Sequence, residues 1–237
     1  MIELPRVIGH RGTAATAPEN SLKGFRAAAD AGIEWVEFDV RLSADHVPVV
    51  VHDATLARTA GIEAKISQTT AADIARLSGT HPVPTLAETM SLLGSLGLGA
   101  NVEIKAVRAR RAVVTTVMQT LDLARHDHSI PILVSSFSPP ILEIMQMSAD
   151  HLPRGLLLPR GTSDPIGLAR QLDCISIHED HRRLTSRRVA DWKAAGFLVV
   201  CYTVNDPVRA DQLFGWGVDS IISDTPSVLA EMVVGGQ

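Results

Sequence analysis

The sequence is poor in cysteine, with only Cys174 and Cys201 among its 237 residues. A fold held together by disulfides would need more cysteines in a shorter chain, and a cysteine-based zinc site would need them close together. Each cysteine lies in an apolar run of strand length. We therefore expect two buried, reduced thiols.

Aromatic residues are also scarce, at 4% of the chain, although hydrophobic residues in total reach 46%. The core must therefore consist mainly of Ala, Val, Leu and Ile, which suits short aliphatic strands alternating with Ala-rich helices. A length of 237 residues fits a single α/β-barrel domain.

The chain has no strong excess of one charge and no long apolar run. Its formal net charge is -4, whereas a non-specific nucleic-acid binder usually has a basic face, so we expect no nucleic-acid partner. No segment reaches the roughly 18 apolar residues of a membrane helix, and the N-terminus does not resemble a secretory signal. We expect a soluble, cytoplasmic protein without stable membrane insertion.

Apolar runs of strand length alternate with segments of helical period, which is typical of a parallel sheet with crossover helices. The strand-like runs are residues 7–9, 35–40, 49–52, 101–104, 132–135, 155–158, 174–177, 198–203 and 219–223. The helical segments are residues 21–31, 86–93, 107–125, 140–147, 165–171, 186–195, 207–214 and 226–234. Asn20 is a candidate cap for the first helix, and Thr85 and Glu88 have the spacing of a capping box.

A hairpin accounts for the excess over eight strands. Only residues 41–48 separate the second and third runs, too few for a parallel crossover. A hairpin that turns at residues 44–47 fits, and its symmetric pairing places His52 opposite Asp39. The return strand lies outside the barrel count, so we predict a (β/α)8 TIM barrel whose second strand is extended by a β-hairpin.

Residues 53 to about 84 form one oversized connection, and long loops inside compact domains often serve function. Residues 70–77 could supply one short helix there. We interpret this segment as a small insertion that caps the barrel mouth, and residues 1–237 as one domain.

Polar side chains gather at the C-terminal ends of the first strands, where barrel enzymes carry their active sites. They are His10, Arg11, Glu37, Asp39, His52, Glu103 and Lys105. Three carboxylates in one mouth repel each other unless a cation lies among them. Hard oxygen ligands favour Mg2+ or Ca2+.

The positive charges suggest that an anion binds in the same mouth, because arginine contacts phosphate in a bidentate manner and lysine acts as a point charge. The imidazoles of His10 and His52 could supply a general base and a general acid near neutral pH. Together these groups indicate metal-assisted phosphoryl chemistry. Alternatively, Glu103 and Lys105 could form an ion pair with a purely structural role.

An ordered set of motifs resembles the glycerophosphodiester phosphodiesterase family from about residue 7 to residue 230. The motifs are HRG at 10–12, PEN at 18–20, EFD at 37–39, VHD at 51–53 followed by RT at 58–59, EIK at 103–105, SF at 136–137, TVN at 203–205, GVD at 217–219 and SDTP at 223–226.

The resemblance implies hydrolysis of glycerophosphodiesters to sn-glycerol 3-phosphate and an alcohol. It implies a divalent metal on Glu37, Asp39 and Glu103, and an acid–base pair of His10 and His52. It also implies phosphate contacts from Arg11 and Lys105, and Phe137 and Tyr202 beside the glycerol or alcohol end. Attack by water and attack by the substrate's own neighbouring hydroxyl, through a cyclic phosphate, both stay open.

The chain departs from the family pattern at two positions. His46 occupies a hairpin turn where glycine is usual, and Tyr202 stands where tryptophan commonly precedes TVN. The second departure changes one wall of the expected pocket, so the preferred alcohol is not fixed.

Two other functions remain as alternatives: a phosphodiesterase acting on lysophospholipids, and a non-catalytic barrel that binds a phosphate metabolite. A homodimer is possible. Residues 178–181, with sequence HEDH, could be mistaken for a metal cluster at the mouth, and Asp224 is expected to cap the last helix.

Overall fold

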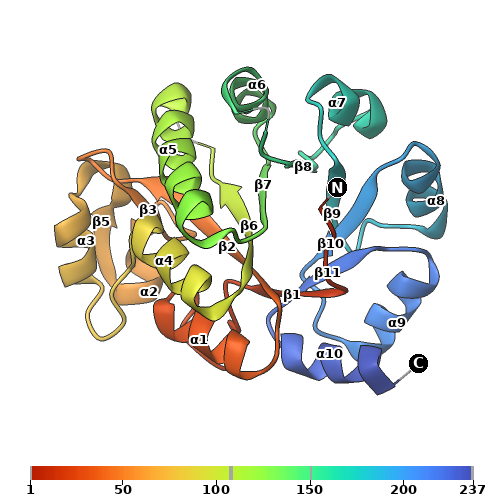
Figure 1. Ribbon diagram of the computed structural model, residues 1–237, viewed down its shortest axis with the longest axis horizontal. Coiled ribbons are helices and arrows are strands. Elements are labelled where there is room, and N and C mark those ends of the chain that lie inside the picture. Colours follow the sequence, from red (N-terminus) through yellow and green to blue (C-terminus); the bar gives the residue numbers. More distant parts are fainter. Residues whose placement is uncertain (1, 107–108, 150, 236–237) are drawn as a thin grey trace.

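Eight parallel strands close into a barrel in the computed structural model, which describes residues 2–106, 109–149 and 151–235 (Figure 1). They are β1 (Val7–His10), β2 (Trp35–Leu42), β6 (Gly99–Ile104), β7 (Ile132–Ser136), β8 (Arg154–Leu157), β9 (Ser176–Asp180), β10 (Leu198–Tyr202) and β11 (Ser220–Ser223). Because β1 pairs with both β2 and β11, the ring is complete. The predicted TIM barrel is confirmed.

Helices surround the strands (Figure 1). They are α1 (Leu22–Asp30), α4 (Leu86–Leu96), α5 (Arg110–His128), α6 (Pro139–Ser148), α7 (Pro165–Gln171), α8 (Ser186–Ala194), α9 (Pro207–Gly215) and α10 (Pro226–Gly235). Each predicted helical segment overlaps one of them, although the expected start of α5 at 107–108 lies outside the described residues. In the described parts of the chain, no helix combines the length and hydropathy that crossing a membrane requires.

The alternation along β2 divides its side chains between two environments. Val36, Phe38 and Val40 belong to the large core shared with the helices. Trp35 belongs to a smaller cluster that fills the barrel interior. Its buried residues all lie on strands, and they are Ile8, Trp35, Leu133, Val200 and Ile222. A Cβ on Gly99 would lie 2.3 Å from the Trp35 ring, which explains the glycine beside it.

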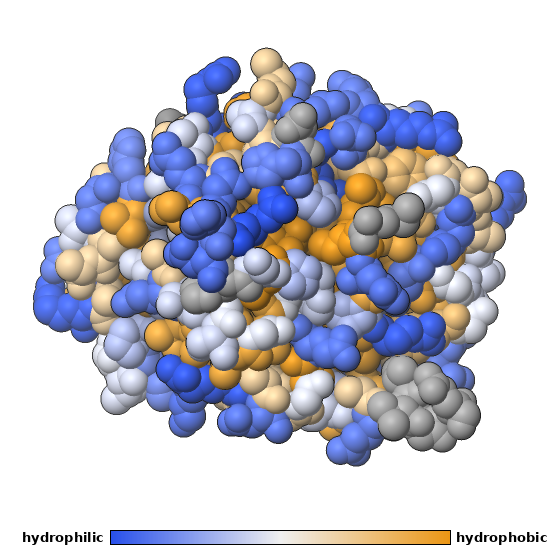
Figure 2. Space-filling model, in the orientation of Figure 1, coloured by the Kyte–Doolittle hydropathy of each residue, from blue (hydrophilic) through white to orange (hydrophobic). Residues whose placement is uncertain are grey.

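The distribution of hydrophilic residues on the surface and the burial of the two cysteines are both consistent with this core. On the face drawn in Figure 2, hydrophilic residues dominate the periphery and hydrophobic ones show mainly toward the middle. Cys174 and Cys201 are buried and free, as expected from their apolar surroundings in the sequence.

The predicted hairpin forms, but its register differs from the prediction. β3 (Pro48–Val50) runs antiparallel to β2, and the Val51 N–H donates to the Asp39 carbonyl at 2.9 Å. The predicted pairing of Asp39 with His52 is therefore wrong by one residue, and His52 lies beyond the strand. The cause is the turn, in which Ser43 pairs with Val47 and His46 adopts a left-handed conformation, giving a three-residue loop.

The insertion lies at one side of the barrel (Figure 1). It contains β4 (Thr55–Leu56), α2 (Ala57–Ala60), β5 (Ile62–Lys65), the 3-10 helix η1 (Ile66–Gln68) and α3 (Ala71–Leu77). α3 confirms the predicted short helix, whereas the β4–β5 pair and the two shorter helices were not predicted. Val49 and Val51 of the hairpin form one core with Leu56, Ile66 and Ile74, so the insertion packs on the extended second strand.

Candidate active site

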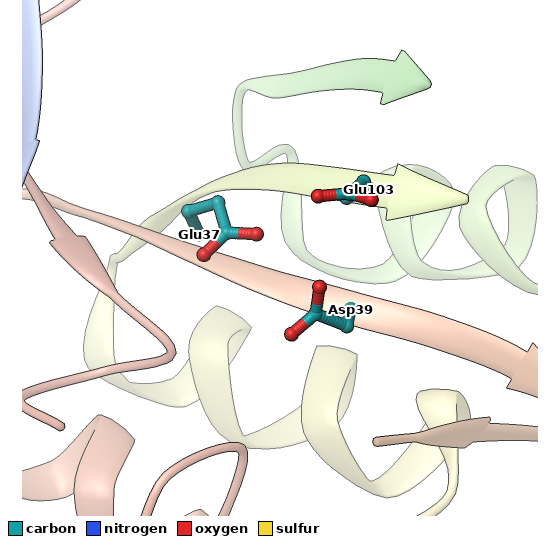
Figure 3. A group of neighbouring side chains, drawn as sticks. All are labelled: Glu37, Asp39 and Glu103. Carbon is teal, nitrogen blue, oxygen red and sulfur yellow. The ribbon is translucent and has the colours of Figure 1, made fainter. Parts of the chain in front are cut away.

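Three carboxylates converge at neighbouring strands, Glu37 and Asp39 on β2 and Glu103 on β6 (Figure 3). The parallel register sets Asp39 beside Glu103, and the alternation of β2 puts Glu37 on the same face. One oxygen from each carboxylate lies within 4.8 Å of the other two, and all three side chains are buried. The structure thus brings the predicted metal ligands together.

The protonation of this cluster reflects its crowding. Burial raises the pKa of Glu37 to about 8, and the nearby charge of Asp39 adds to the shift. Burial also raises the pKa of Glu103, against the opposing effect of Lys105. For Asp39 burial is outweighed by Lys105 and Arg11, which lower its pKa to about 2. A hard divalent cation suits these oxygen ligands and would stabilise the charged forms of Glu37 and Glu103, whose pKa values burial raises.

Both predicted phosphate-binding cations border the carboxylates. Lys105 Nζ lies 2.7 Å from Asp39 Oδ1 and 2.5 Å from Glu103 Oε1. Arg11 Nε lies 3.2 Å from Asp39 Oδ2. The ion pair between Glu103 and Lys105 therefore exists, as the structural alternative required, but Lys105 is shared with a second carboxylate.

A tight turn after β1 places Arg11. Arg11 and Gly12 both have left-handed backbone conformations, with φ values of 49° and 93°. A Cβ on Gly12 would lie 2.8 Å from the carbonyl carbon of Gly24, so only glycine lets this turn lie against α1. The turn directs the backbone N–H of Arg11 to Glu37 Oε2 at 3.2 Å.

His10 ends β1 and is oriented by Asp224. Its Nδ1 lies 2.6 Å from Asp224 Oδ1, and its Nε2 lies 3.8 Å from Glu37 Oε2. Burial acts to lower the pKa of His10, but the hydrogen bond to Asp224 and the charge of Glu37 prevail and raise it. The expected helix-capping role of Asp224 is wrong, because its oxygens accept from His10 and Asn205 instead.

His52 follows β3 and is oriented by its neighbour in sequence. Its Nδ1 lies 2.7 Å from Asp53 Oδ1. Burial lowers the pKa of His52, with Lys105 adding to the effect and Asp39 opposing it. His10 and His52 thus each bond a carboxylate through Nδ1, which fixes the ring and leaves Nε2 for another partner.

Asn20, which the sequence offered as a helix cap and as part of the PEN motif, contacts the carboxylate cluster. Its Nδ2 donates to Asp39 Oδ2 at 2.8 Å, and its Oδ1 accepts from the backbone N–H of Asp39. The expected capping role is wrong, because Ser21 Oγ accepts from the Gly24 N–H and caps α1. The PEN motif was the available signal, but a residue just before a helix is more often read as a cap.

Phe137 and Tyr202 meet at the rim. Phe137 follows β7 and Tyr202 ends β10, and their ring centroids lie 6.0 Å apart with the planes at 87°. Phe137 is 38% exposed, so this edge-to-face pair is accessible from solvent.

The HEDH segment at residues 178–181, which resembles a set of metal ligands in sequence, does not form a compact metal-binding group. His178 and Glu179 lie inside β9 and are fully buried. Glu179 is in register with Cys201, a residue of the core shared with the helices, so it faces the helices and the expectation that it faces the mouth is wrong. His178 Nε2 bonds Ser176 Oγ, and the Glu179 carboxylate pairs with Arg183 and Arg188. Within the described residues, the only His, Cys, Asp or Glu group compact enough to hold a metal is Glu37, Asp39 and Glu103.

Comparisons with known proteins agree along most of the chain. A model of the "Glycerophosphoryl diester phosphodiesterase family" matches residues 10–228. A glycerophosphodiester phosphodiesterase of Caldanaerobacter subterraneus subsp. tengcongensis is 29% identical over 238 residues, covering 96% of this chain and 97% of that protein.

Solved structures agree as well. A phosphodiesterase from Oleispira antarctica, in complex with the product sn-glycerol-3-phosphate, matches with a TM-score of 0.91 and 31% identity over 97% of both chains. A glycerophosphodiester phosphodiesterase from Thermotoga maritima, at 24% identity and a TM-score of 0.81, covers 98% of this chain and 100% of its own and shares the fold.

Proposed function

Because the chain belongs to the glycerophosphoryl diester phosphodiesterase family and is therefore a phosphoric diester hydrolase, we propose that it cleaves glycerophosphodiesters to sn-glycerol 3-phosphate and an alcohol with the help of a divalent metal. One observation carries the proposal: three buried carboxylates, two cations and two carboxylate-bound imidazoles meet at the C-terminal ends of adjacent strands. This is the end of a TIM barrel at which catalysis takes place.

Glu37, Asp39 and Glu103 are the proposed metal ligands, and Mg2+ or Ca2+ suits their oxygen atoms. The bound ion would act as a Lewis acid and neutralise charge on the phosphate. The donor set supports this role, since burial and then the charge of Asp39 raise the pKa of Glu37, and a divalent cation would favour its ionised form.

Arg11 and Lys105 are the proposed phosphate contacts. Both lie beside Asp39, so a phosphate near the acidic cluster would be within reach of a planar guanidinium and of a compact ammonium group. Their charge offsets the repulsion between an anionic substrate and three carboxylates. Asn20 supports both by fixing Asp39 between them.

His10 and His52 are the proposed acid–base pair. One imidazole accepts the proton of the attacking hydroxyl or water, and the other donates a proton to the oxygen of the leaving alcohol. Asp224 and Asp53 each accept from Nδ1, which would leave Nε2 to handle these protons. Trapping a cyclic phosphate during turnover would distinguish attack by the neighbouring hydroxyl from attack by water.

Phe137 and Tyr202 are proposed to border the glycerol or alcohol end of the substrate, since Phe137 is exposed at the rim and stacks edge-to-face with Tyr202. We also propose that residues 1–237 act as one catalytic domain with the segment from about 53 to 84 as its cap. The possible homodimer stays a prediction that the mass in solution would test.

The function is tested by a substrate panel read out as sn-glycerol 3-phosphate. Release of this product from glycerophosphocholine in the presence of Mg2+ or Ca2+ supports the proposal. Equal or faster turnover of lysophosphatidylcholine would favour the lysophospholipid alternative. Tight binding without any product would favour the non-catalytic alternative.

Replacing either histidine should remove acid–base catalysis. We expect His10→Ala and His52→Ala each to lower kcat by at least ~10^2-fold. His151→Ala is the matched control, because His151 also binds a carboxylate, that of Asp122, but is half-exposed. It lies just before β8, at the N-terminal end of the strands, opposite the site. A normal rate in either active-site variant would remove that histidine from the mechanism.

A further inference from the structure

Arg58 is the part of the RT motif to which the proposed mechanism gives no role. It lies on α2 of the insertion, and its guanidinium joins two carboxylates. Its Nε donates to Asp53 Oδ2 at 2.6 Å. Its Nη1 and Nη2 donate to the two oxygens of Glu19 at 2.7 and 2.6 Å.

Each carboxylate bound by Arg58 also binds a proposed site residue through a further contact. Asp53 accepts from His52 Nδ1 through its other oxygen. Glu19 Oε1 accepts from Arg11 Nη1 at 2.9 Å. One continuous chain of charged hydrogen bonds therefore runs His52, Asp53, Arg58, Glu19, Arg11.

These hydrogen bonds cross a gap between the insertion and the barrel rim. A cleft of about 250 Å³ separates the two there, and its lining includes Glu19 and His52 from the barrel side, with Thr80 and His81 from the insertion. Arg58 also lines the cleft and spans it. Its guanidinium is thus a direct polar link between the insertion and the catalytic end of the barrel.

We propose that Arg58 is a positioning residue, which orients His52 through Asp53 and holds Arg11 available for phosphate through Glu19. The inference rests on the proposed function of His52 and Arg11 and extends it to the insertion. It gives the insertion a task in the reaction: to supply a side chain that bonds both Asp53, beside His52, and Glu19, beside Arg11.

The two contacts of Arg58, with Asp53 and with Glu19, have different effects on the reaction. Without it, Asp53 is free to rotate away from His52, which impairs proton transfer and lowers kcat. Glu19 would then pair with Arg11 alone, so the positive charge of Arg11 would be more fully neutralised and phosphate would bind less tightly. Lysine replaces arginine only in part here, because a compact ammonium group lacks the planar fork through which three nitrogens of Arg58 reach Asp53 Oδ2 and both oxygens of Glu19.

Overall stability should depend little on this contact. The Arg58 side chain is 51% exposed, and ion pairs of exposed side chains contribute little to folding. A loss of activity without a loss of stability is therefore the signature of a positioning role.

The test measures kcat, KM and the affinity for sn-glycerol 3-phosphate in Arg58→Ala, Arg58→Lys and Arg76→Ala. Arg76 is the matched control, an arginine of the same insertion that pairs with the exposed Asp73 of its own helix. We expect Arg58→Ala to lower kcat about tenfold and to weaken product binding, with an unchanged melting temperature. Arg58→Lys should restore only part of kcat, and Arg76→Ala should match the wild type.

A double-mutant cycle separates the effect of the Asp53 contact from the effect of the Glu19 contact. In an Asp53→Asn background, adding Arg58→Ala should reduce kcat by less than about twofold more but should still weaken binding of sn-glycerol 3-phosphate. An Arg58→Ala enzyme within about twofold of the wild type in both kcat and product affinity would overturn the inference, as would a full, additive loss of kcat in the Asp53→Asn background.

Two controls keep the result interpretable. If Arg58→Ala does not fold, a fully active Arg58→Lys enzyme would contradict the inference, because that change keeps the charge and removes only the bridge. An inactive wild type would count against the proposed function, whereas an active wild type with an unaffected Arg58→Ala enzyme would count against this inference alone.

Discussion

The orientation of His10 depends on Asp224, which lies 214 residues further along the chain. Its Nδ1 is committed to Asp224 Oδ1, and Asn205 Nδ2 in turn holds the other oxygen of that carboxylate at 2.8 Å. Carboxylates that hold a histidine ring fix its tautomer and direction. At His52 the carboxylate that binds Nδ1 belongs to Asp53, the next residue in sequence. The two imidazoles therefore have equivalent carboxylate contacts, although the sequence separations differ greatly.

We expect Asp224→Asn to lower kcat by about 10–100-fold while leaving the fold intact, because the amide can no longer hold the His10 ring as a charged acceptor. Steady-state rates and the circular dichroism spectrum check this result. Asp122→Asn is the control, because it alters the carboxylate that binds the remote His151. It should leave kcat unchanged. Equal rates for Asp224→Asn and the wild type would show that Asp224 does not support catalysis.

His178 should make stability depend on pH. Burial lowers the pKa of His178 to about 3, from 6.5 for a free side chain. As pH falls below 6.5 the unfolded chain takes up this proton and the folded chain does not, so stability is lost toward pH 3 by up to about 1.4 kcal/mol per unit. Above the unfolded pKa the group has no such effect.

The variant His178→Asn isolates that contribution. Urea unfolding at pH 7, 6 and 5 should show a shallower decline of unfolding free energy for the variant than for the wild type, whatever their difference at pH 7. Other titrating groups are common to both proteins and cancel in the comparison. Parallel declines would mean that His178 is accessible to protons in the folded state.

At the scale of elements, the β2–β3 hairpin shows where sequence reasoning holds and where it ends. The connection of residues 41–48, too short for a parallel crossover, was sufficient to predict a hairpin. The register was not predictable, because it depends on whether the loop closes at Ser43–Val47 or one residue further on. A one-residue difference in a loop changes every cross-strand pair.

Local signals were dependable where both partners lie within one turn of chain. The capping box of Thr85 and Glu88 forms as its spacing predicts. Asn20 and Asp224 were misassigned because their true partners, Asp39 and His10, belong to other strands. The β4–β5 pair was missed because β4 has only two residues, too few to establish a period.

The hairpin turn gives a stability prediction. His46 is exposed and has a φ of 63°, a conformation that costs an L-residue about 1–2 kcal/mol and glycine almost nothing. Glycine gives part of this back in chain entropy, so His46→Gly should raise the free energy of unfolding by up to about 1 kcal/mol. Chemical denaturation measures the change, with His46→Ala as the control that should bring no gain. A less stable glycine variant would contradict the strain that we assign to the turn.

At the scale of the whole molecule, closure of the barrel assembles the site. The candidate residues from His10 to Lys105 come from the first half of the chain, on strands β1, β2 and β6 and the hairpin between them. Only because β11 returns to pair with β1 does Asp224 reach His10. The alternation of strand-like and helical runs was sufficient to predict the barrel, and the polar residues at the strand ends were sufficient to predict the converging carboxylates. The contacts across the closing seam required the structure.

The central claim, that a cation held by Glu37, Asp39 and Glu103 supports phosphodiester cleavage, is tested most directly by metal removal. The measurement is release of sn-glycerol 3-phosphate from glycerophosphocholine by protein stripped with EDTA, then titrated with Mg2+ or Ca2+, for the wild type and Glu103→Gln. We predict that stripping abolishes product release, that one of the two ions restores it, and that the variant needs at least about tenfold more metal. Full turnover by protein whose freedom from metal is verified by elemental analysis would contradict the account.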